Sequence, residues 1–461
     1  MQNKISVAFT FLVVIYIAII QFYNLGKLPI VQWDESRLAV NAAEMTINRS
    51  YLVTTYENLP DLWNTKPPLM IWLQSACMTL FGIHEFSVRF PSAISGFICI
   101  LFLGFWVQRI SKSWFVSSFA MLVLAVSGGF IQLHGSITGD YDALLSLFVL
   151  LSVYHFTRLY FDKNPKSIIY FPLFVSLAVM SKSAAGIIMF PLFVLYPLAQ
   201  KKWKSLYQIS LALSLAIIPF IVYCLLRENA NSGYIEKMWL NDFGGRFNEV
   251  IEGHGHPWYY YLENLVFERM TYFIYLLLPA IIWFVFKKNH SMIFLSFFVV
   301  GFLLILSVSK TKIHWYDMPL LPLISLLISV FLYQIIELIR SRLVKGIIAI
   351  IVFLMCLPLI VQKFNFISQH QNMSLSFDHY ELSEYLRNYN DKEPLRYVSL
   401  NYDPEFYFYT KSNPLIKKGI IGQFKEGEKV VLQNVFESDF ASEHDYEVIE
   451  TYKGVKCVRV K

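Results

Sequence analysis

The chain has 461 residues, a length at which a soluble protein would form about three domains. Its composition excludes that organisation, because 56% of the residues are hydrophobic and only 16% are charged. Soluble chains average about 45–50% and about 25%. So little polar surface cannot cover a water-soluble body, and the same numbers exclude disorder and collagen-like repeats. The net charge of +6 matters less than where the basic residues lie. The composition predicts a polytopic membrane protein.

Eleven apolar segments are candidate membrane helices, since a spanning helix needs about 20 mostly apolar residues. They are expected near 5–23, 90–109, 115–133, 140–160, 168–181, 183–200, 205–226, 265–286, 291–308, 316–336 and 345–361. The break at Ser181-Lys182-Ser183 fits either two short helices that meet at one surface or a single bent segment. The first segment begins like a signal peptide, but no small-residue cleavage site follows it, and we expect it to stay as an anchor.

The loops between these segments separate by charge. With the N-terminus in the cytoplasm, the inside loops are short and basic, at 109–112, 158–166, 201–204, 287–288 and 340–345. Most acidic residues lie in the opposite loops. The positive-inside rule therefore places the two long loops, 24–89 and 227–264, on the external face.

A change of composition after residue 361 predicts a second domain. Residues 362–461 are polar and charged, and we expect them to follow a membrane domain over 1–361. Segments that begin at Arg396, Lys429 and Val455 have strand character, and 378–389 has helical character. The sequence therefore predicts a small external α/β domain.

The first external loop carries an acidic pair, Asp34 and Glu35, next to Trp33. Such a pair just outside the membrane is a candidate general base or metal ligand. The alternative is that the two acids are solvated loop residues or cap a helix. Further along, Lys66 precedes two prolines that stiffen the chain as it returns to the membrane. A lysine held at headgroup depth can bind a phosphate as a point charge, whereas the alternative is a lysine that snorkels to the interface.

Four more cations lie on the same face, where the positive-inside rule does not explain them. Lys310 and Lys312 follow an apolar segment, Lys182 lies between two apolar segments, and Arg246 lies in the second long loop. A lysine close to hydrocarbon is costly and indicates a role, unless an interfacial position accounts for it. We expect these residues to help bind an anion.

Asp140, His254 and His256 are candidate contacts to the non-lipid part of a substrate. The two histidines could bind a metal, but no third ligand lies nearby, and we favour an aromatic interfacial belt. Neither a disulfide framework nor a zinc cluster is expected, because the cysteines occur singly and without a CxxC pair. They are Cys77, Cys99, Cys224, Cys356 and Cys457.

Carboxylates and cations thus share one face, above helices that can contact lipid tails. Substrates that fit this arrangement are anionic lipids whose headgroup is processed at the membrane surface. An enzyme on the external face cannot draw on cytoplasmic nucleotides. Its activated donor is therefore expected to be a lipid-linked phosphate.

Several motifs over about residues 1–340 carry a resemblance to a known superfamily. They are Trp33-Asp-Glu-Ser-Arg-x-Ala, Ala43-Glu-Met, Thr65-Lys-Pro-Pro-Leu-x-x-Trp, Phe81-Gly with Val88-Arg-Phe-Pro-Ser, Asp140-Tyr-Asp-Ala-Leu, Lys182, and Lys310-Thr-Lys-x-x-Trp-Tyr-x-x-Pro. With them the chain resembles the GT-C glycosyltransferases. Within that superfamily it is most similar to aminoarabinose transferases and protein O-mannosyltransferases.

This resemblance implies roles for several residues. Asp34 would be the catalytic carboxylate, with Glu35 beside it in acceptor binding or structural support. Lys66 would contact the lipid phosphate, helped by Lys182, Lys310 or Lys312. The chain departs from the aminoarabinose transferases at Thr65, where they usually carry glutamate, and this difference is consistent with a different sugar.

We therefore predict an inverting hexosyl or pentosyl transferase in the bacterial inner membrane. It would move a sugar from a polyprenyl-phosphate donor to a lipid, glycan or protein acceptor on the periplasmic or exterior side. Asp34 would deprotonate the acceptor, and Lys66 would stabilise the departing phosphate. We expect no cofactor and no nucleic-acid partner; a lipid monophosphate leaving group does not demand a metal, although a divalent ion is possible.

Two other classes of protein would also use many helices and cations. A transporter or flippase of lipid-linked saccharides needs polar groups near the membrane midplane and usually has internal repeats. The charges here crowd one face, and the sequence shows no repeat. A non-catalytic lipid-binding scaffold is the other alternative, and it would not need Asp34.

Overall fold

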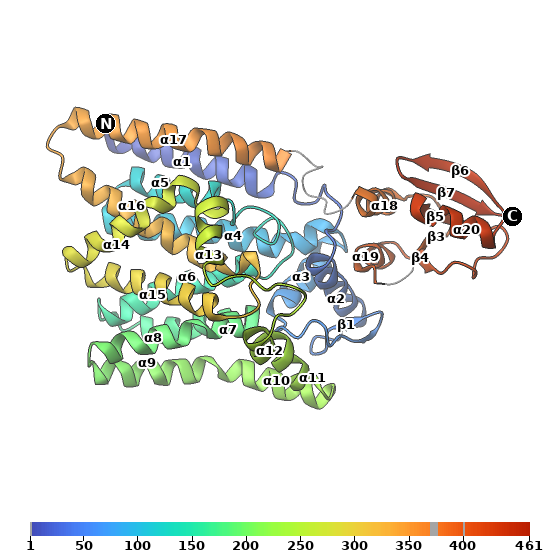
Figure 1. The fold of residues 1–461 in the computed structure, drawn as a ribbon, viewed down its shortest axis with the longest axis horizontal. Helices are drawn as coiled ribbons and strands as arrows, with labels where there is room; N and C mark the ends of the chain where they lie inside the picture. Colours follow the sequence, from blue (N-terminus) through green and yellow to red (C-terminus); the bar gives the residue numbers. More distant parts are fainter. Residues whose placement is uncertain (1, 369–376, 400–401) are drawn as a thin grey trace. The chain divides into compact units, whose positions relative to one another are not determined.

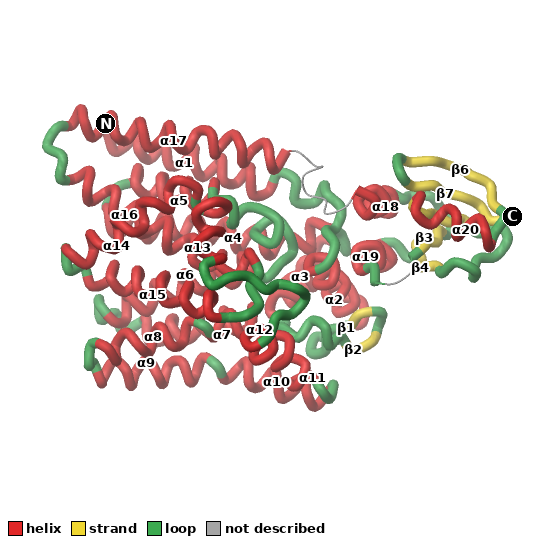
Figure 2. Tube along the Cα trace, viewed as in Figure 1, coloured by secondary structure: helices red, strands yellow, loops and turns green. Residues whose placement is uncertain are grey.

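The computed structural model describes residues 2–368, 377–399 and 402–461. The chain forms two compact units. We call the first the membrane unit, which consists of Met1–Tyr23, Thr65–Met70 and Ser92–Ile367. The second, the mixed unit, consists of Asn24–Asn64, Ile71–Pro91 and Ser368–Lys461. Figure 2 shows helices throughout the first unit and the strands of the second. Part of the predicted membrane domain, from the first external loop, thus groups with the C-terminal residues.

Seven helices of the described chain are long and apolar enough to cross a bilayer. They are α4 (Glu85–Ser111), α6 (Asp142–Tyr160), α7 (Ser167–Ile187), α9 with α10 (Trp203–Ala216, Ile218–Ala230), α15 (His290–Val308), η4 with α16 (His314–Leu320, Leu321–Glu337) and α17 (Arg342–Ser368). Shorter apolar helices are α1 (Gln2–Phe22), α3 (Leu69–Phe81), α5 (Trp114–Val126), α8 (Met189–Ala199) and η3 with α14 (Thr271–Leu276, Leu277–Phe286). Each of the eleven predicted segments coincides with one of these helices. The predicted polytopic helical class is confirmed.

The first long loop contains more regular structure than the sequence analysis expected. It includes α2 (Asp34–Asn48), a hairpin of β1 (Thr55–Tyr56) and β2 (Leu59–Pro60), and α3. Helix α3 has 13 residues and lies between Lys66 and His84, so the apolar run that contains it is too short to be predicted as a spanning segment. Helix α2 starts with the acidic pair in its first turn, where negative charge stabilises a helix.

The second long loop also folds into short helices. They are α11 (Tyr234–Met238), η1 (Trp239–Phe243), α12 (Gly244–Asn248), α13 (Tyr260–Glu263) and η2 (Asn264–Arg269). No element among them is longer than two turns, so sequence periodicity gives little sign of them. They matter because one wall of the candidate site comes from η1 and α12.

Helix α7 is bent at the Ser181-Lys182-Ser183 segment, where two helical stretches meet at a kink. Lys182 has φ −153° and ψ 67°, and Ser183 has φ 8° and ψ −98°, so two successive residues leave helical geometry. Gly186 allows the turn after the kink to lie against the turn before it. A Cβ atom at Gly186 would lie 2.6 Å from the Cα atom of Val179. The kink therefore depends on a glycine four residues beyond Lys182.

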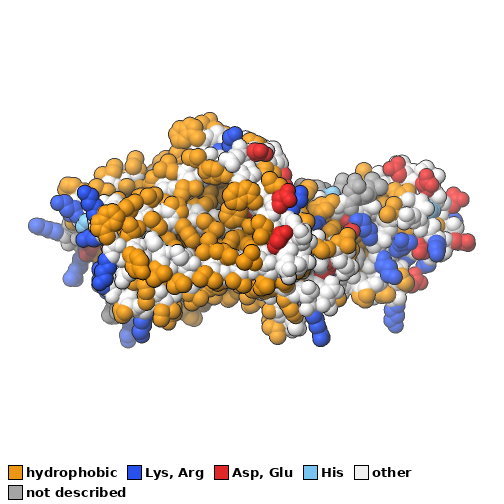
Figure 3. Space-filling model, turned by 90° about the horizontal axis from the view of Figure 1, so that it is seen from below, with side chains coloured by type: hydrophobic (Ala, Val, Ile, Leu, Met, Phe, Trp, Pro, Cys, Tyr) orange, Lys and Arg blue, Asp and Glu red, His pale blue; other side chains and the backbone are white. Residues whose placement is uncertain are grey.

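Basic side chains collect at one end of the membrane unit. The turns between α8 and α9, α14 and α15, and α16 and α17 lie together at the left of Figure 1 and carry the basic groups at 201–204, 287–288 and 340–345. Figure 3 shows lysine and arginine side chains at this end and hydrophobic side chains along the flank of the unit. This distribution agrees with the charge difference between loops on which the predicted orientation rests.

Helix α17 lies beside α1 at the edge of the membrane unit (Figure 1). The Tyr16 hydroxyl donates to the carbonyl oxygen of Ile360 at 3.0 Å, and the rings of Phe9 and Phe353 contact at 5.4 Å. Only 6% of the most apolar stretch of α17 is buried, as expected of a helix whose surface faces lipid.

A five-stranded sheet forms the core of the mixed unit, in the order β4-β3-β5-β7-β6. Strand β3 is parallel to β4 and β5, and β7 is antiparallel to β5 and β6. The strands are β3 (Leu395–Val398), β4 (Ile416–Gly419), β5 (Lys429–Gln433), β6 (Tyr446–Tyr452) and β7 (Val455–Val460). The helices are α18 (Phe377–Asn388), α19 (Pro404–Ser412), η6 (Asn434–Phe436) and α20 (Glu437–Glu443). The three predicted strands and the predicted helix are present, which confirms a small C-terminal α/β region.

The kink in α7 can be tested by substitution of its glycine. Gly186→Ala should lower the thermal midpoint of the detergent-purified protein by several degrees, because the new methyl group meets backbone atoms. Overpacking of this kind costs about 1–3 kcal/mol. Gly346→Ala in α17 is the matched control, since nothing lies within 4 Å of its Cβ position, and it should leave the midpoint unchanged or slightly raised. Equal midpoints for Gly186→Ala and wild type would show that the kink tolerates a side chain.

Candidate active site

A cavity of about 480 Å³ in the membrane unit brings together three of the predicted anion ligands. Lys66 reaches it from the segment before α3, Lys182 from the kink of α7, and Arg246 from α12. Residues far apart in the sequence therefore place three cations around one space. The other polar side chains in its wall are Asp142, Ser183, Asp242, Asn248, Ser309 and Tyr316.

Much of the remaining wall is apolar. The end of α7, α8 and α15 contribute Ile187, Ile188, Pro191, Phe302, Ile305 and Leu306. Small-molecule sites commonly combine apolar walls with a few polar groups that fix orientation. Here the polar groups include three cations, so the cavity suits an amphiphile with an anionic head and a hydrocarbon tail.

Lys182 forms a buried ion pair with Asp142. Its Nζ donates to the two carboxylate oxygens of Asp142 at 2.7 and 2.8 Å, and the two side chains are only 8% and 3% exposed. The ring of Tyr316 lies 4.9 Å from the same Nζ. Asp142 is the first residue of α6, so the pair joins the start of α6 to the kink of α7. Within the cavity, the charge of Lys182 is already balanced.

Arg246 is held by neighbouring oxygen atoms. Its Nε donates to the carbonyl oxygen of Asn241 at 2.7 Å, and its Nη1 donates to the Tyr316 hydroxyl at 3.3 Å. Its Nη2 lies 3.6 Å from a carboxylate oxygen of Glu252, a side chain that is 53% exposed. The guanidinium is thereby oriented, while its counter-charge stays in contact with solvent.

Lys66 differs from the other two cations. Its Nζ lies 5.6 Å from the centroid of the Tyr141 ring, and the residue is half-buried. Across the residues that the structure describes, no carboxylate forms an ion pair with it. The positive charge of Lys66 is therefore available for a ligand in the cavity.

Asp142, Asp242 and Tyr316 in the cavity wall were not predicted as site residues. Asp142 and Tyr316 lie inside the motifs that begin at Asp140 and Lys310, so a signal for them was present in the sequence. Asp242 lies in η1, in a loop where the sequence showed no motif. Its role follows only from the structure.

Two predicted phosphate ligands lie elsewhere in the membrane unit. Lys310 and Lys312 line a second cavity of about 680 Å³, together with His256 and Trp258. Lys312 is buried, its Nζ donates to the carbonyl oxygen of Ser309 at 2.5 Å, and burial lowers the pKa of its ammonium. The spacing of the two lysines in the sequence could not reveal that they turn away from the first cavity.

The two predicted histidines flank this second cavity differently. The His256 ring stacks on Tyr260, with centroids 4.1 Å apart. The backbone carbonyl of His254 accepts a hydrogen bond from the backbone nitrogen of Lys312 at 2.9 Å. The structure thus gives His256 an aromatic partner, and His254 a contact to the segment that carries Lys312.

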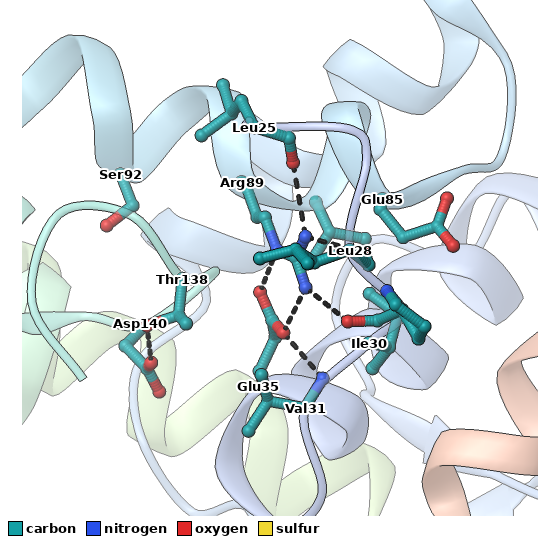
Figure 4. A network of polar contacts seen from close by, with 12 residues as sticks. Leu25, Leu28, Ile30, Val31, Glu35, Glu85, Arg89, Ser92, Thr138 and Asp140 are labelled. Carbon is teal, nitrogen blue, oxygen red and sulfur yellow. Dashed lines mark hydrogen bonds and ion pairs between the residues drawn. The ribbon is translucent and has the colours of Figure 1, made fainter. Parts of the chain in front are cut away.

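Asp140 lies in the loop before α6. Its Oδ2 accepts a hydrogen bond from the Thr138 hydroxyl at 2.5 Å (Figure 4), and its Oδ1 lies 3.7 Å from Nδ1 of His134. Burial alone would raise the pKa of Asp140, but His134 and Thr138 hold it below its usual range. The ring of His134 stacks on Trp315 at 3.8 Å. A carboxylate and an imidazole are both possible metal ligands, and the expected absence of a metal stays a prediction.

In the mixed unit, Glu35 is enclosed by Arg89 (Figure 4). Its Oε1 accepts from Arg89 Nε at 2.7 Å, and its Oε2 accepts from Arg89 Nη2 at 2.9 Å and from the Val31 backbone nitrogen at 2.7 Å. Both side chains are almost completely buried. Arg89 also donates to the carbonyl oxygens of Leu25, Leu28 and Pro29. Glu35 thus ties the start of α2 to Arg89 of α4.

Asp34 begins α2 and is half-buried. The residue before it, Trp33, has φ 73°, a left-handed conformation that is costly for a bulky side chain. One turn further on, Arg37 donates to both oxygens of Asp61 at 2.8 Å and covers the ring of Tyr56. Burial alone would raise the pKa of Asp61, but these bonds lower it. The helix turn that carries Asp34 is therefore held by two ion pairs.

Residues 65–225 match the family model described as dolichyl-phosphate-mannose-protein mannosyltransferase. That range includes Lys66, Asp142 and Lys182. An uncharacterized protein of Aquifex aeolicus (strain VF5) is 24% identical over 70% of this chain and 63% of its own. The undecaprenyl phosphate-alpha-4-amino-4-deoxy-L-arabinose arabinosyl transferase of Enterobacter sp. (strain 638) is 23% identical over 80% of this chain and 70% of its own. The chain thus spans about two thirds of the length of these two relatives.

Solved structures show a similar fold. ArnT from Cupriavidus metallidurans, in a crystal structure with undecaprenyl phosphate, superposes with a TM-score of 0.72 at 14% identity over 98% of both chains. The oligosaccharyltransferase of Archaeoglobus fulgidus superposes with a TM-score of 0.59 at 12% identity, over 94% of this chain and 69% of its own. The chain has the fold of the GT-C glycosyltransferases, as its motifs predicted. Within that superfamily its fold is similar to that of ArnT.

The Glu35–Arg89 pair yields a test of how α2 is held. Glu35→Ala should destabilise the protein by about 3–5 kcal/mol, because it leaves a buried guanidinium without its counter-charge. Glu35→Gln keeps an oxygen acceptor for Arg89 and should cost less. Thermal unfolding in detergent measures both variants, and Glu426→Gln, at an exposed position, is the control that should change stability by less than about 0.5 kcal/mol. A Glu35→Ala midpoint equal to that of the control would contradict the supporting role.

Proposed function

We propose that the protein is an inverting glycosyltransferase that uses a polyprenyl-phosphate sugar donor at the external face of the bacterial inner membrane. The observation that carries this proposal is the cavity in which Lys66, Lys182 and Arg246 meet apolar walls. The similarity to undecaprenyl-phosphate aminoarabinose transferases and to the dolichyl-phosphate-mannose family supports a polyprenyl phosphate as the donor lipid. The basic end of the membrane unit supports the orientation.

The donor phosphate is proposed to bind between Lys66 and Arg246. Lys66 has no ion pair to break within the described part of the chain, and the Arg246 guanidinium is already oriented through Tyr316. Charge-assisted bonds to a phosphate are stronger than neutral ones. Lys182 lies in the same wall, but its charge is balanced by Asp142. The first isoprene units then lie along the apolar wall.

The transfer step is a single displacement. The acceptor hydroxyl oxygen attacks the anomeric carbon from the face opposite the phosphate, and its proton passes to the carboxylate of Asp34. The bond from the anomeric carbon to the phosphate oxygen breaks, so the configuration inverts and the lipid phosphate leaves. Lys66 and Arg246 stabilise the negative charge that develops on this leaving group.

The remaining predicted residues are assigned to the acceptor side. Asp140, His254 and His256 are proposed contacts to acceptor or sugar. We assign Lys310 and Lys312 to the acceptor side and not to the donor phosphate, because they line the second cavity with His256. The acceptor is a lipid, glycan or protein.

The phosphate assignment predicts a binding defect. Lys66→Ala should weaken the binding of undecaprenyl phosphate to the detergent-purified protein by about ten- to a hundredfold, the value of one charge-assisted hydrogen bond. Lys66→Arg keeps the charge and should lose less. Lys288→Ala, in an exposed basic loop, is the matched control. Equal dissociation constants for Lys66→Ala and the control, measured by native mass spectrometry, would remove Lys66 from the phosphate site.

The role of Asp34 is tested by turnover. Asp34→Asn keeps the size of the side chain but cannot accept a proton, so turnover should fall about 10²–10⁴-fold while lipid phosphate binding is kept. The acceptor is first identified by mass spectrometry of envelope lipids, polysaccharides and glycoproteins from cells with and without the gene. Asp162→Asn, an exposed acid in a basic loop, is the control. Turnover of Asp34→Asn within a few-fold of wild type would place the base elsewhere.

A further inference from the structure

Asp242 places a carboxylate in a cavity whose other features favour an anion. It lies in η1 and lines the same wall as Arg246. Its Oδ2 accepts hydrogen bonds from the Thr65 hydroxyl at 3.2 Å and from the Ser183 hydroxyl at 3.1 Å. Within the described residues, no lysine or arginine forms an ion pair with Asp242, whereas Asp142 is fully paired.

The charge balance of the cavity does not account for this carboxylate. Lys182 is neutralised by Asp142, and Arg246 faces Glu252. An additional negative charge weakens the positive potential that attracts a phosphate, and the effect grows as water is excluded. A site for phosphate alone would bind more tightly with a neutral amide in this place. Asp242 is therefore expected to contact a part of the ligand other than the phosphate.

The neighbours of Asp242 donate hydrogen bonds to its Oδ2 and not to its Oδ1. Thr65 is completely buried, and its carbonyl oxygen accepts from the Tyr234 hydroxyl at 2.7 Å, so its own hydroxyl is held in place. Both hydroxyl donors go to Oδ2, which leaves the lone pairs of Oδ1 for a ligand. Thr65 directly precedes Lys66 in the chain, so this acceptor lies close to the cation proposed to bind the phosphate.

We propose that Asp242 recognises the donor sugar by accepting hydrogen bonds from its hydroxyl or amino groups, and that it excludes sugars that carry a carboxylate. This inference rests on the proposed function. In a glycosyl phosphate the ring substituents lie within a few bonds of the phosphate, so a carboxylate beside the phosphate ligands faces the sugar. Like charges brought together in a binding site reduce affinity, which makes the same group a selective element. The donor sugar is then neutral or cationic.

The test compares three lipids that differ only in the headgroup: undecaprenyl phosphate, undecaprenyl phosphate glucose and undecaprenyl phosphate glucuronate. Their dissociation constants are measured with the full-length protein in detergent. Wild type should bind the glucose lipid at least about tenfold more tightly than the glucuronate lipid. Asp242→Asn should bring this ratio to about one, with binding of the bare lipid phosphate unchanged or tighter. Asp242→Glu keeps the charge and should keep the preference.

A ratio unchanged in Asp242→Asn, or absent in wild type, would overturn the inference. If Asp242→Asn does not fold, Asp242→Glu and wild type still decide, because both must reject the glucuronate lipid. Lys66→Ala separates this result from the proposed function. It should weaken the binding of all three lipids and leave the ratio of the glucose and glucuronate dissociation constants unchanged. Because the readout is binding and not turnover, a role for Asp242 in proton transfer would not produce the expected change in ratio.

Discussion

The buried ion pair between Asp142 and Lys182 is the interaction on which the candidate active site depends. It joins the first residue of α6 to the kink of α7, and these two helices supply much of the cavity wall. Loss of either partner would leave a charge buried among apolar side chains, a cost of several kcal/mol. The pair also fixes what Lys182 can do. Its ammonium lies in the cavity wall, but its charge is balanced by Asp142.

The other charged groups of the cavity differ in the kind of ligand group that each can bind. Among the residues that the structure describes, Lys66 has no ion-pair partner and Asp242 accepts hydrogen bonds from the hydroxyl groups of Thr65 and Ser183. Arg246 is oriented by Tyr316 and faces an exposed acid. Lys66 and Arg246 suit an anion, and Asp242 suits hydrogen-bond donors next to that anion. A phosphate with a sugar attached presents both kinds of group. This is why we propose that the cavity binds a glycosyl lipid and not a simple phospholipid.

The sequence predicted the helices because apolar runs of the length of a bilayer have few other interpretations, and it predicted Lys66 and Lys182 because cations near hydrocarbon are costly. It did not reveal α3, which is too short to span, or Asp242, which lies in short helices without periodicity. The sequence also could not show which side chains contact one another or which cavity they line. Lys310 and Lys312 had the same charge and spacing signals as Lys66, yet the fold turns them to another cavity. Arg89 lay in a recognised motif, but only the structure shows that it encloses Glu35.

The kink of α7 has a consequence for solvent. Two successive residues outside helical geometry interrupt the ladder of backbone hydrogen bonds, and hydrocarbon cannot satisfy the amide groups that are released. A broken helix at membrane depth is tolerated where it lines a polar space, as the segment around Lys182 does in the cavity wall. Water in that space can hydrogen-bond to the released amide groups, and a headgroup that enters the cavity would have to replace it. Water access to the cavity is thus a condition of the fold itself, set by the backbone before any substrate arrives.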